Sequence, residues 1–228
     1  MEPYSSGKIE LHFDVLPKET KVALEYLASQ DWMRNSNFYL AGGTALALSM
    51  GHRKSVDLDF FTKDKSFNNV KLLKNLSLAE NLVTDINKED TVYVRLFKAK
   101  VSFISYPFFV PKKDFITYGG VRILEPSDVS VMKIIAISQR GKKRDFFDLY
   151  WYANNIENLE NVIKKLKHQY PSVAHDYHHI LKSLTYFEDA ESDPDPIIYF
   201  DATWDKVKEF FKKETPDIIK KLINLKED

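Results

Sequence analysis

The sequence predicts an α/β fold in which a mixed sheet with flanking helices is followed by a helical C-terminal portion. A short apolar run at 38–41 ends at a Gly-Gly pair and leads into a helical segment, and residues 55–61 alternate with period two. Residues 91–106 are rich in β-branched and aromatic side chains, as strands are. After residue 125 most apolar residues recur at helical spacing. We therefore expect an α/β core over 1–125 and a mainly helical region over 126–228.

The individual elements follow from local signals. Proline at a helix start, glycine after a helix end and proline after a strand mark most of the boundaries. In chain order we expect a helix from Pro17 to Gln30, a strand at 38–41, a helix at 44–50 closed by Gly51, a strand at 55–61, a helix at 66–81, paired strands at 91–97 and 100–106, a short strand at 119–124 and a capped amphipathic helix at 127–139.

Composition excludes several classes of protein. The 228 residues include 33 basic and 33 acidic side chains, so no global positive field attracts a polyanion and any contact with nucleic acid must be local. Cysteine is absent, which excludes disulfides, thiolate metal sites and a cysteine nucleophile. The N-terminal residues show no signal-peptide pattern, and no apolar run is long enough to span a membrane. We expect a cytoplasmic protein with no membrane partner.

The segment FYLAGGTALALSMGHRKSVDLDFF, residues 38–61, is the most informative. Gly42 and Gly43 between a strand and a helix let backbone N–H groups approach an anion at the helix N-terminus, and Thr44 adds a hydroxyl. Asp57 and Asp59, two residues apart on a strand, point the same way and can chelate a divalent metal beside bound phosphates.

Each of these two features has an ordinary structural explanation. A Gly-Gly pair is most often a tight turn, and an isolated Asp-x-Asp is most often a solvated strand face. Here the aspartates alternate with Val56, Leu58 and Phe60, so the opposite face of the strand is expected to be buried. A like-charge pair in such a position favours a bound cation.

The helix at 127–139 brings further charged residues. Lys133 and Arg140, at positions i and i+7, are expected near one face, where both could meet one anionic ligand. Lys133 lies among apolar residues, so it either extends to solvent or faces a charge partner. Arg140, Lys142, Lys143 and Arg144 form a local basic cluster that either contacts an RNA backbone or complements the helix dipole.

Two motif regions resemble the nucleotidyltransferase superfamily that includes DNA polymerase β, and within it the AbiEii/AbiGii abortive-infection toxins. The first is LAGGTALAL through HRKSVDLDF (residues 40–60), with an Arg-x-Ser lead-in at Arg53 and Ser55. The second is LEPSDVSVMKIIAISQRGKKRDFFDLY (residues 124–150), which is similar to the lysine-bearing helix and the basic Asp-x-x-Asp-Leu ending of these toxins. Together they frame about half of the chain, and the last 75 or so residues carry no familiar motif.

The resemblance implies a nucleotidyltransferase fold and transfer of NMP from an NTP to an acceptor, the 3′ end of a tRNA. It also implies Mg²⁺ or Mn²⁺ as cofactor and a DNA-binding antitoxin as partner in a type IV toxin–antitoxin system. The site roles that it implies are catalytic for Asp57, Asp59, Lys133 and Asp145, metal binding for Asp57 and Asp59, nucleotide binding for Gly42, Gly43, Thr44, Arg53, Ser55 and Lys133, and RNA binding for Arg140, Lys142, Lys143 and Arg144. Asp148 is expected to be structural, and the helical region is expected to complete the active-site cleft.

One departure from the superfamily pattern concerns a third metal-binding carboxylate. The matching strand reads KVSFISY (residues 100–106), with Ser102 at the central position. Two alternatives stay open: a small-molecule nucleotidyltransferase of the aminoglycoside-modifying kind, which the basic run at 140–144 disfavours, and a non-catalytic protein that binds a nucleotide or a partner, which Ser102 favours. His175 and His179, four residues apart, have a spacing compatible with a metal pair but lack a neighbouring glutamate.

Overall fold

The computed structural model describes residues 10–173 and 176–224. Within them the chain divides into two compact units, one up to Val129 and the other from Ser130 onward, and each is described by itself. None of the helices in the described ranges has the length and apolar character needed to cross a bilayer.

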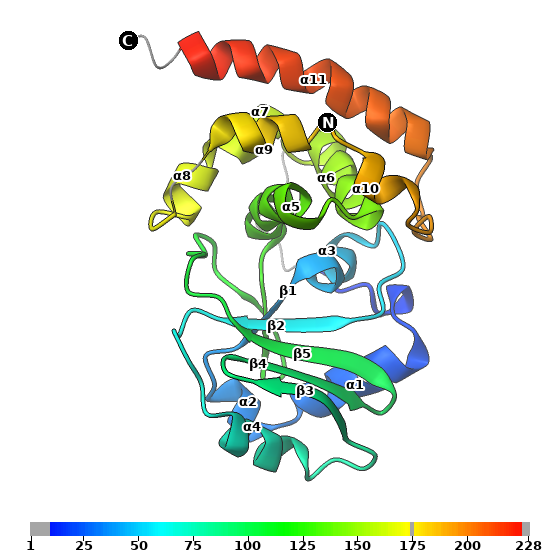
Figure 1. Ribbon diagram of the computed structural model, residues 1–228. Helices are drawn as coiled ribbons and strands as arrows, with labels where there is room; N and C mark the ends of the chain where they lie inside the picture. Colours follow the sequence, from blue (N-terminus) through cyan, green and yellow to red (C-terminus); the bar gives the residue numbers. More distant parts are fainter. Residues whose placement is uncertain (1–9, 174–175, 225–228) are drawn as a thin grey trace. The chain divides into compact units, whose positions relative to one another are not determined.

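The first unit is a seven-stranded mixed sheet with helices, in the strand order β3-β4-β5-β2-β1-β7-β6. Figure 1 shows β2, β5, β4 and β3 side by side. The strands are β1 (Tyr39–Ala41), β2 (Leu58–Thr62), β3 (Val83–Lys88), β4 (Thr91–Leu96), β5 (Ala99–Ser105), β6 (Ile116–Tyr118) and β7 (Val121–Ile123). The helices are a 3₁₀ turn at Phe13–Val15, α1 (Lys18–Ala28), α2 (Asp31–Arg34), α3 (Gly42–Met50) and α4 (Asn69–Leu76).

The direction of each strand follows from its connection. Strands β4 and β5 are antiparallel because a tight turn joins them, and Phe97 and Lys98 in that turn have the positive φ angles typical of hairpin turns. Strands β2 and β5 are parallel, since α4, β3 and β4 lie between them in the chain. The parallel pairing sets Asp59 opposite Ser102.

One face of this sheet forms the core of the unit. Leu58, Phe60, Val101 and Phe103 are almost fully buried, and the rings of Phe60 and Phe103 stack at 5.2 Å. Helix α1 contacts β5 and buries its own apolar residues, as its amphipathic pattern predicts. The alternating residues of the same strands, Asp59 and Ser102 among them, therefore project from the opposite face.

The second unit is helical. Its core includes an aromatic cluster in which Phe146 lies 5.3–5.6 Å from the rings of Phe187, Trp204 and Phe211. The helices are α5 (Pro126–Arg140), which begins in the first unit, α6 (Lys143–Asn155), α7 (Leu159–Lys164), α8 (Leu166–Gln169), α9 (Tyr177–Ser183), α10 (Glu188–Glu191) and α11 (Trp204–Asn224).

The expected fold class is confirmed: a mixed sheet with flanking helices, followed by helices. Several boundaries differ from the expected ones. Strands β3 and β6 were not expected. Strand β3 has an irregular register against β4 and little buried surface, and a strand without a buried face shows no clean alternation of apolar and polar residues. The expected helix at 66–81 is only α4, and Val70 and Leu78 are exposed. Leu78 lies after the end of α4, so the apolar pattern predicted a helix that is longer than the observed one.

Candidate active site

The turn from β1 into α3 brings backbone close to a carboxylate. Gly42 has a φ of +67°, a conformation that favours glycine, and begins α3. A side-chain Cβ at Gly42 would lie 3.4 Å from Oδ2 of Asp59. Because α3 begins at Gly42, two residues earlier than expected, Gly43 also lies in its first turn, where N–H groups have no partner within the helix. The N-terminus of a nine-residue helix therefore adjoins Asp59.

Asp57 and Asp59 both line an open cavity of about 390 Å³ in the first unit. Both side chains are partly exposed. The expected strand at 55–61 begins only at Leu58, so Asp57 precedes β2, and Val56 is 46% exposed and not buried as expected. The two carboxylates nevertheless line the same cavity. Its lining residues are Asp57, Asp59, Asp85, Tyr93, Val94, Lys100, Val101 and Ser102.

Ser102 occupies the position at which the superfamily pattern has a third carboxylate. It pairs with Asp59 across β2 and β5, and its Oγ donates a hydrogen bond of 2.6 Å to Oδ1 of Asp59. A hydrogen bond to a charged acceptor is among the stronger ones in proteins. Ser102 therefore orients the side chain of Asp59. A carboxylate at the same position would instead add a negative charge to the site.

The hydroxyls of Thr44 and Ser55 are buried and hydrogen bonded to each other at 2.8 Å. The Thr44 hydroxyl also donates to the backbone carbonyl of Asp57. Arg53 is 4% exposed, and its Nη1 donates to the carbonyl of Lys54 at 2.8 Å. Thr44 thus contacts the segment that leads into β2, and the nucleotide-binding roles expected for Thr44, Arg53 and Ser55 stay predictions.

In the second unit, Lys133 is held by two aspartates. Its Nζ lies 2.6 Å from a carboxylate oxygen of Asp145 and 2.6 Å from one of Asp148, and all three side chains are buried. Arg140 donates to Asp145 through Nε at 2.9 Å and Nη2 at 3.2 Å. Lys133 and Arg140 thus meet one anion, as their spacing indicates, and in this structure that anion is Asp145.

The ion pairs also set the charge state of Asp145. Burial raises the pKa of its carboxyl, but the positive charges of Lys133 and Arg140 and their hydrogen bonds more than offset this, so the pKa lies below its ordinary value. Asp145 is ionised at neutral pH. The pairing of Asp148 with Lys133 could not be read from the sequence, since it joins two helices whose packing has no local signal.

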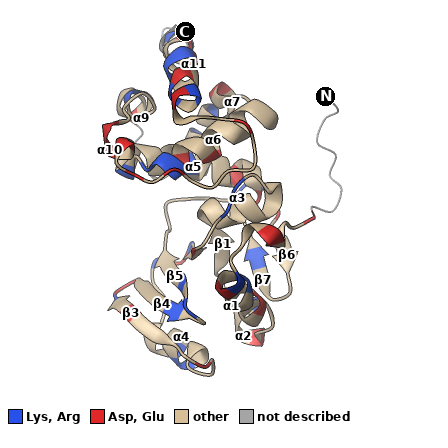
Figure 2. Ribbon diagram, turned by 90° about the vertical axis from the view of Figure 1, so that its right-hand side faces the viewer, with Lys and Arg blue, Asp and Glu red and all other residues tan. Residues whose placement is uncertain are grey.

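The basic cluster is largely compensated by nearby acids. Lys142 Nζ lies 3.0 Å from Asp193 and Lys143 Nζ lies 3.0 Å from Asp195, while Arg140 pairs with Asp145. Figure 2 shows blue segments near α5 and red segments at α10 in this unit. Asp193 and Asp195 follow α10, so the segment after this helix neutralises part of the cluster. RNA binding by these four basic residues stays a prediction.

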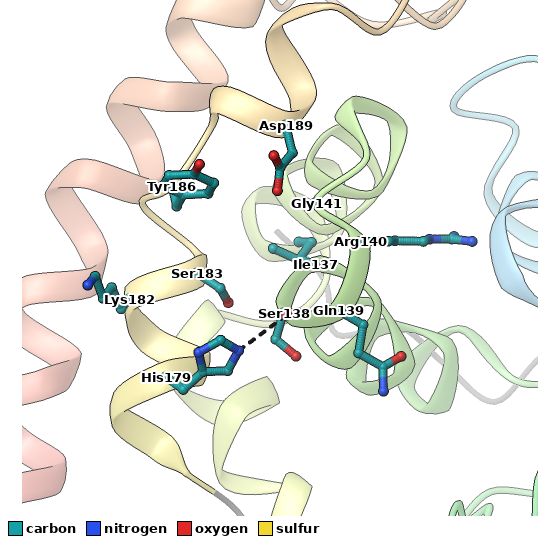
Figure 3. Close-up of a pocket in the computed structure, with 10 residues that line it drawn as sticks. All are labelled: Ile137, Ser138, Gln139, Arg140, Gly141, His179, Lys182, Ser183, Tyr186 and Asp189. Carbon is teal, nitrogen blue, oxygen red and sulfur yellow. Dashed lines mark hydrogen bonds between the residues drawn. The ribbon is translucent and has the colours of Figure 1, made fainter.

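His179 lies in a second cavity of about 270 Å³, between the end of α5 and helices α9 and α10 (Figure 3). Its Nε2 is 3.3 Å from the backbone carbonyl of Ser138. Tyr186 and Asp189 also line this cavity, whereas Arg140 extends away from it in Figure 3. His175 lies outside the described residues, so the histidine pair stays a prediction.

A mixed sheet that sets a glycine-rich helix N-terminus beside paired aspartates is the arrangement of nucleotidyltransferases, and the chain is one of them. The sequence model of the nucleotidyl transferase AbiEii toxins of type IV toxin–antitoxin systems matches residues 34–224. The chain belongs to this family, which confirms the resemblance seen in its motifs.

Relatives agree with this assignment. An uncharacterized protein of Aquifex aeolicus is 35% identical over 214 residues, which cover 90% of this chain and 98% of that protein. MenT4, a nucleotidyltransferase toxin from Mycobacterium tuberculosis, has a similar fold with a TM-score of 0.52 at 17% identity, over 86% of this chain and 84% of that one. A crystal structure from H. pylori assigned to the nucleotidyltransferases has a TM-score of 0.51 at 20% identity, over 90% and 97%.

Proposed function

We propose that the protein transfers NMP from an NTP to a hydroxyl of an RNA acceptor, the 3′ end of a tRNA, with a divalent metal, and that it acts as the toxin of a pair with a cognate antitoxin. The observation that carries this proposal is the approach of Gly42 to Asp59, where a Cβ placed on Gly42 would lie only 3.4 Å from Asp59 Oδ2. A helix N-terminus binds phosphate, and a carboxylate beside it binds the cation that accompanies a triphosphate.

The residues at Asp59 fit a metal of the Mg²⁺ type. Such ions commonly bind through one or two carboxylates together with substrate phosphates, and Asp57 and Asp59 line one cavity. No cluster of three or more metal-ligating side chains is found in the described ranges, so the substrate would complete the ligand set. When bound, the metal supplies positive charge that stabilises the developing pyrophosphate.

The chain's own residues bind and orient the substrates. The acceptor hydroxyl oxygen forms a bond to the α-phosphorus, the bond from that phosphorus to the bridging oxygen breaks, and pyrophosphate leaves. The proton of the hydroxyl passes to water or to a carboxylate. The N–H groups of Gly42 and Gly43 bind phosphate oxygens, and Ser102 holds Asp59 in its orientation. The roles that the family resemblance gives Lys133 and Asp145 stay predictions.

Transfer of label tests this function. The purified protein is incubated with each of the four α-labelled NTPs, total cellular RNA and Mg²⁺, beside the variant Asp57→Ala/Asp59→Ala. We expect labelled tRNA with the wild type only, and loss of labelling when EDTA is added. Labelling of a small cationic molecule and not of RNA would replace the RNA acceptor by a small-molecule one. Absence of both transfer and NTP binding would refute the enzymatic function.

A further inference from the structure

Four residues on neighbouring strands form one row across the first unit's sheet. Strand pairing sets Ala41 opposite Asp59, Asp59 opposite Ser102, and Ser102 opposite Tyr93. Directly paired residues project from the same face of a sheet, so Asp59, Ser102 and Tyr93 share the face that lines the cavity. We call these four residues the cross-strand row. Its β1 end continues into the glycines of α3, and its β4 end is an aromatic ring.

The two ends of this row suit different parts of a nucleotidyl-transfer reaction. Displacement at phosphorus requires the attacking oxygen and the leaving oxygen to lie roughly in line, on opposite sides of the phosphorus. If pyrophosphate leaves from Gly42 and Gly43, the acceptor hydroxyl approaches Asp59 from the β5 and β4 side. Tyr93 lies there, two strand spacings from Asp59, which is about 10 Å.

Tyr93 has the properties of a stacking platform. Tyr93 is 37% exposed and lines the cavity, while its strand neighbours Val92 and Val94 are buried and anchor β4. Aromatic rings on exposed strands bind unpaired bases by stacking, which tolerates any base.

The charges beside the ring fit a phosphate backbone. Lys100 is exposed, lines the same cavity, and lies two residues from Ser102 on β5. Asp85 also lines the cavity, but its carboxylate is paired with Arg95 of β4 at 3.0 Å. The basic segments of β4 and β5 are blue in Figure 2. Lys100 pairs with Arg95 and is therefore diagonal to Tyr93 across β4 and β5, where it offers positive charge for a backbone phosphate of a stacked nucleotide.

We propose that Tyr93 and Lys100 form the acceptor subsite: the nucleoside that carries the attacking hydroxyl stacks on Tyr93, and its backbone phosphate contacts Lys100. This inference rests on the proposed function and specifies where its acceptor binds. The group that stacks on Tyr93 is a nucleobase. Both the acceptor and the NTP carry one, and the experiment distinguishes which of the two bases binds there.

The variants separate aromatic stacking from sheet packing. Tyr93→Phe keeps the ring, Tyr93→Leu keeps apolar bulk without it, and Lys100→Ala removes the charge. Matched controls are Tyr199→Ala, an exposed tyrosine of the second unit, and Lys74→Ala, an exposed lysine of α4. Thermal unfolding of each variant checks that it folds, and Lys100→Ala, at an exposed position, keeps the test valid if Tyr93→Leu does not fold.

Two measurements are made on the full chain. Fluorescence anisotropy gives the Kd of a short labelled single-stranded RNA with a free 3′ hydroxyl, and competition with a labelled NTP gives the Kd of the NTP. Steady-state transfer gives KM and kcat for the same RNA. We expect Tyr93→Leu to raise the Kd and KM for RNA about tenfold, as loss of one stacked base does. The NTP Kd and the Tyr93→Phe and control variants should match the wild type.

The possible outcomes are distinguishable. Weaker NTP binding by Tyr93→Leu with unchanged RNA binding would mean that the ring stacks the NTP base, and would overturn the proposed subsite. Unchanged RNA and NTP binding would overturn it as well. If the wild type transfers no label to RNA, the proposed function fails, but an RNA Kd that depends on the Tyr93 ring would still support a base-binding site.

Discussion

Replacing Lys133 by Met tests whether the second unit depends on a buried ion-pair network. The lysine side chain is 4% exposed, and Asp145 and Asp148, each 2.6 Å from its Nζ, are fully buried. Met has a similar length and fills the same space, so the substitution removes the charge with little change in volume. Two buried carboxylates then lose their shared cation.

The size of the effect follows from these contacts. Removing one partner of a buried ion pair costs about 3–5 kcal/mol, because an uncompensated charge stays buried. Asp145 keeps its contacts with Arg140 at 2.9 and 3.2 Å, so the loss should lie near the lower end, at about 3 kcal/mol. For a chain of this size that corresponds to a fall in Tm of about 6–12 °C.

The effect should depend on pH in a definite direction. The pKa of Asp145 is lowered in the folded protein, so this residue stabilises the fold above its unfolded pKa and the stabilisation is lost as pH falls through the folded pKa. In Lys133→Met the buried carboxylates lack their shared cation, so protonation removes part of the uncompensated charge. The difference in the free energy of unfolding between wild type and variant should therefore be smaller at pH 3.5 than at pH 7.

Urea unfolding followed by circular dichroism at pH 7 and at pH 3.5 measures both effects. Lys74→Met, at an exposed position of α4, is the control and should change stability little. The double variant Lys133→Met/Asp148→Asn should regain part of the loss, since it removes one uncompensated charge. A loss below about 1 kcal/mol for Lys133→Met at pH 7, or one that does not change with pH, would refute the buried-network argument.

Three further predictions concern the first unit. Ser102→Ala removes the 2.6 Å hydrogen bond to Asp59, and we expect the Mg²⁺ concentration for half-maximal transfer to rise several-fold; equal Mg²⁺ dependence would contradict the orienting role. Gly42→Ala places a methyl group 3.4 Å from Asp59 Oδ2 at a φ of +67° and should lose about 1–2 kcal/mol in urea unfolding together with NTP affinity; wild-type values of both would count against the close approach. Thr44→Val leaves the Ser55 hydroxyl without its acceptor and the backbone carbonyl of Asp57 without its donor, and should cost about 1–3 kcal/mol in the same unfolding assay, with NTP affinity reduced less than in Gly42→Ala.

Local patterns predicted most of the first unit. The Gly-Gly pair marked the start of α3, and alternation at 55–61 located β2 to within a few residues. These signals work because helix and strand periods and the conformational freedom of glycine are properties of short segments. Strand β3 was missed because only one of its residues is even partly buried, so no hydrophobic period marks it.

The site was predicted in part for the same reason. Asp57 and Asp59 are two residues apart, so their presence in one cavity follows from local geometry, even though β2 begins between them. The sequence did not show that Thr44 and Ser55 hydrogen bond to each other, nor that acids at 193 and 195 would pair with Lys142 and Lys143. Each of these contacts joins residues from separate segments.

The sequence by itself determined the family, the fold class and the paired aspartates beside a glycine turn, because short motifs and their order carry that information. Only the tertiary structure decided what lies next to them. Ser102 is 43 residues from Asp59, and Tyr93 meets Ser102 through the register of a hairpin. Strand order and register depend on how distant segments bury their apolar faces together, which no local pattern encodes.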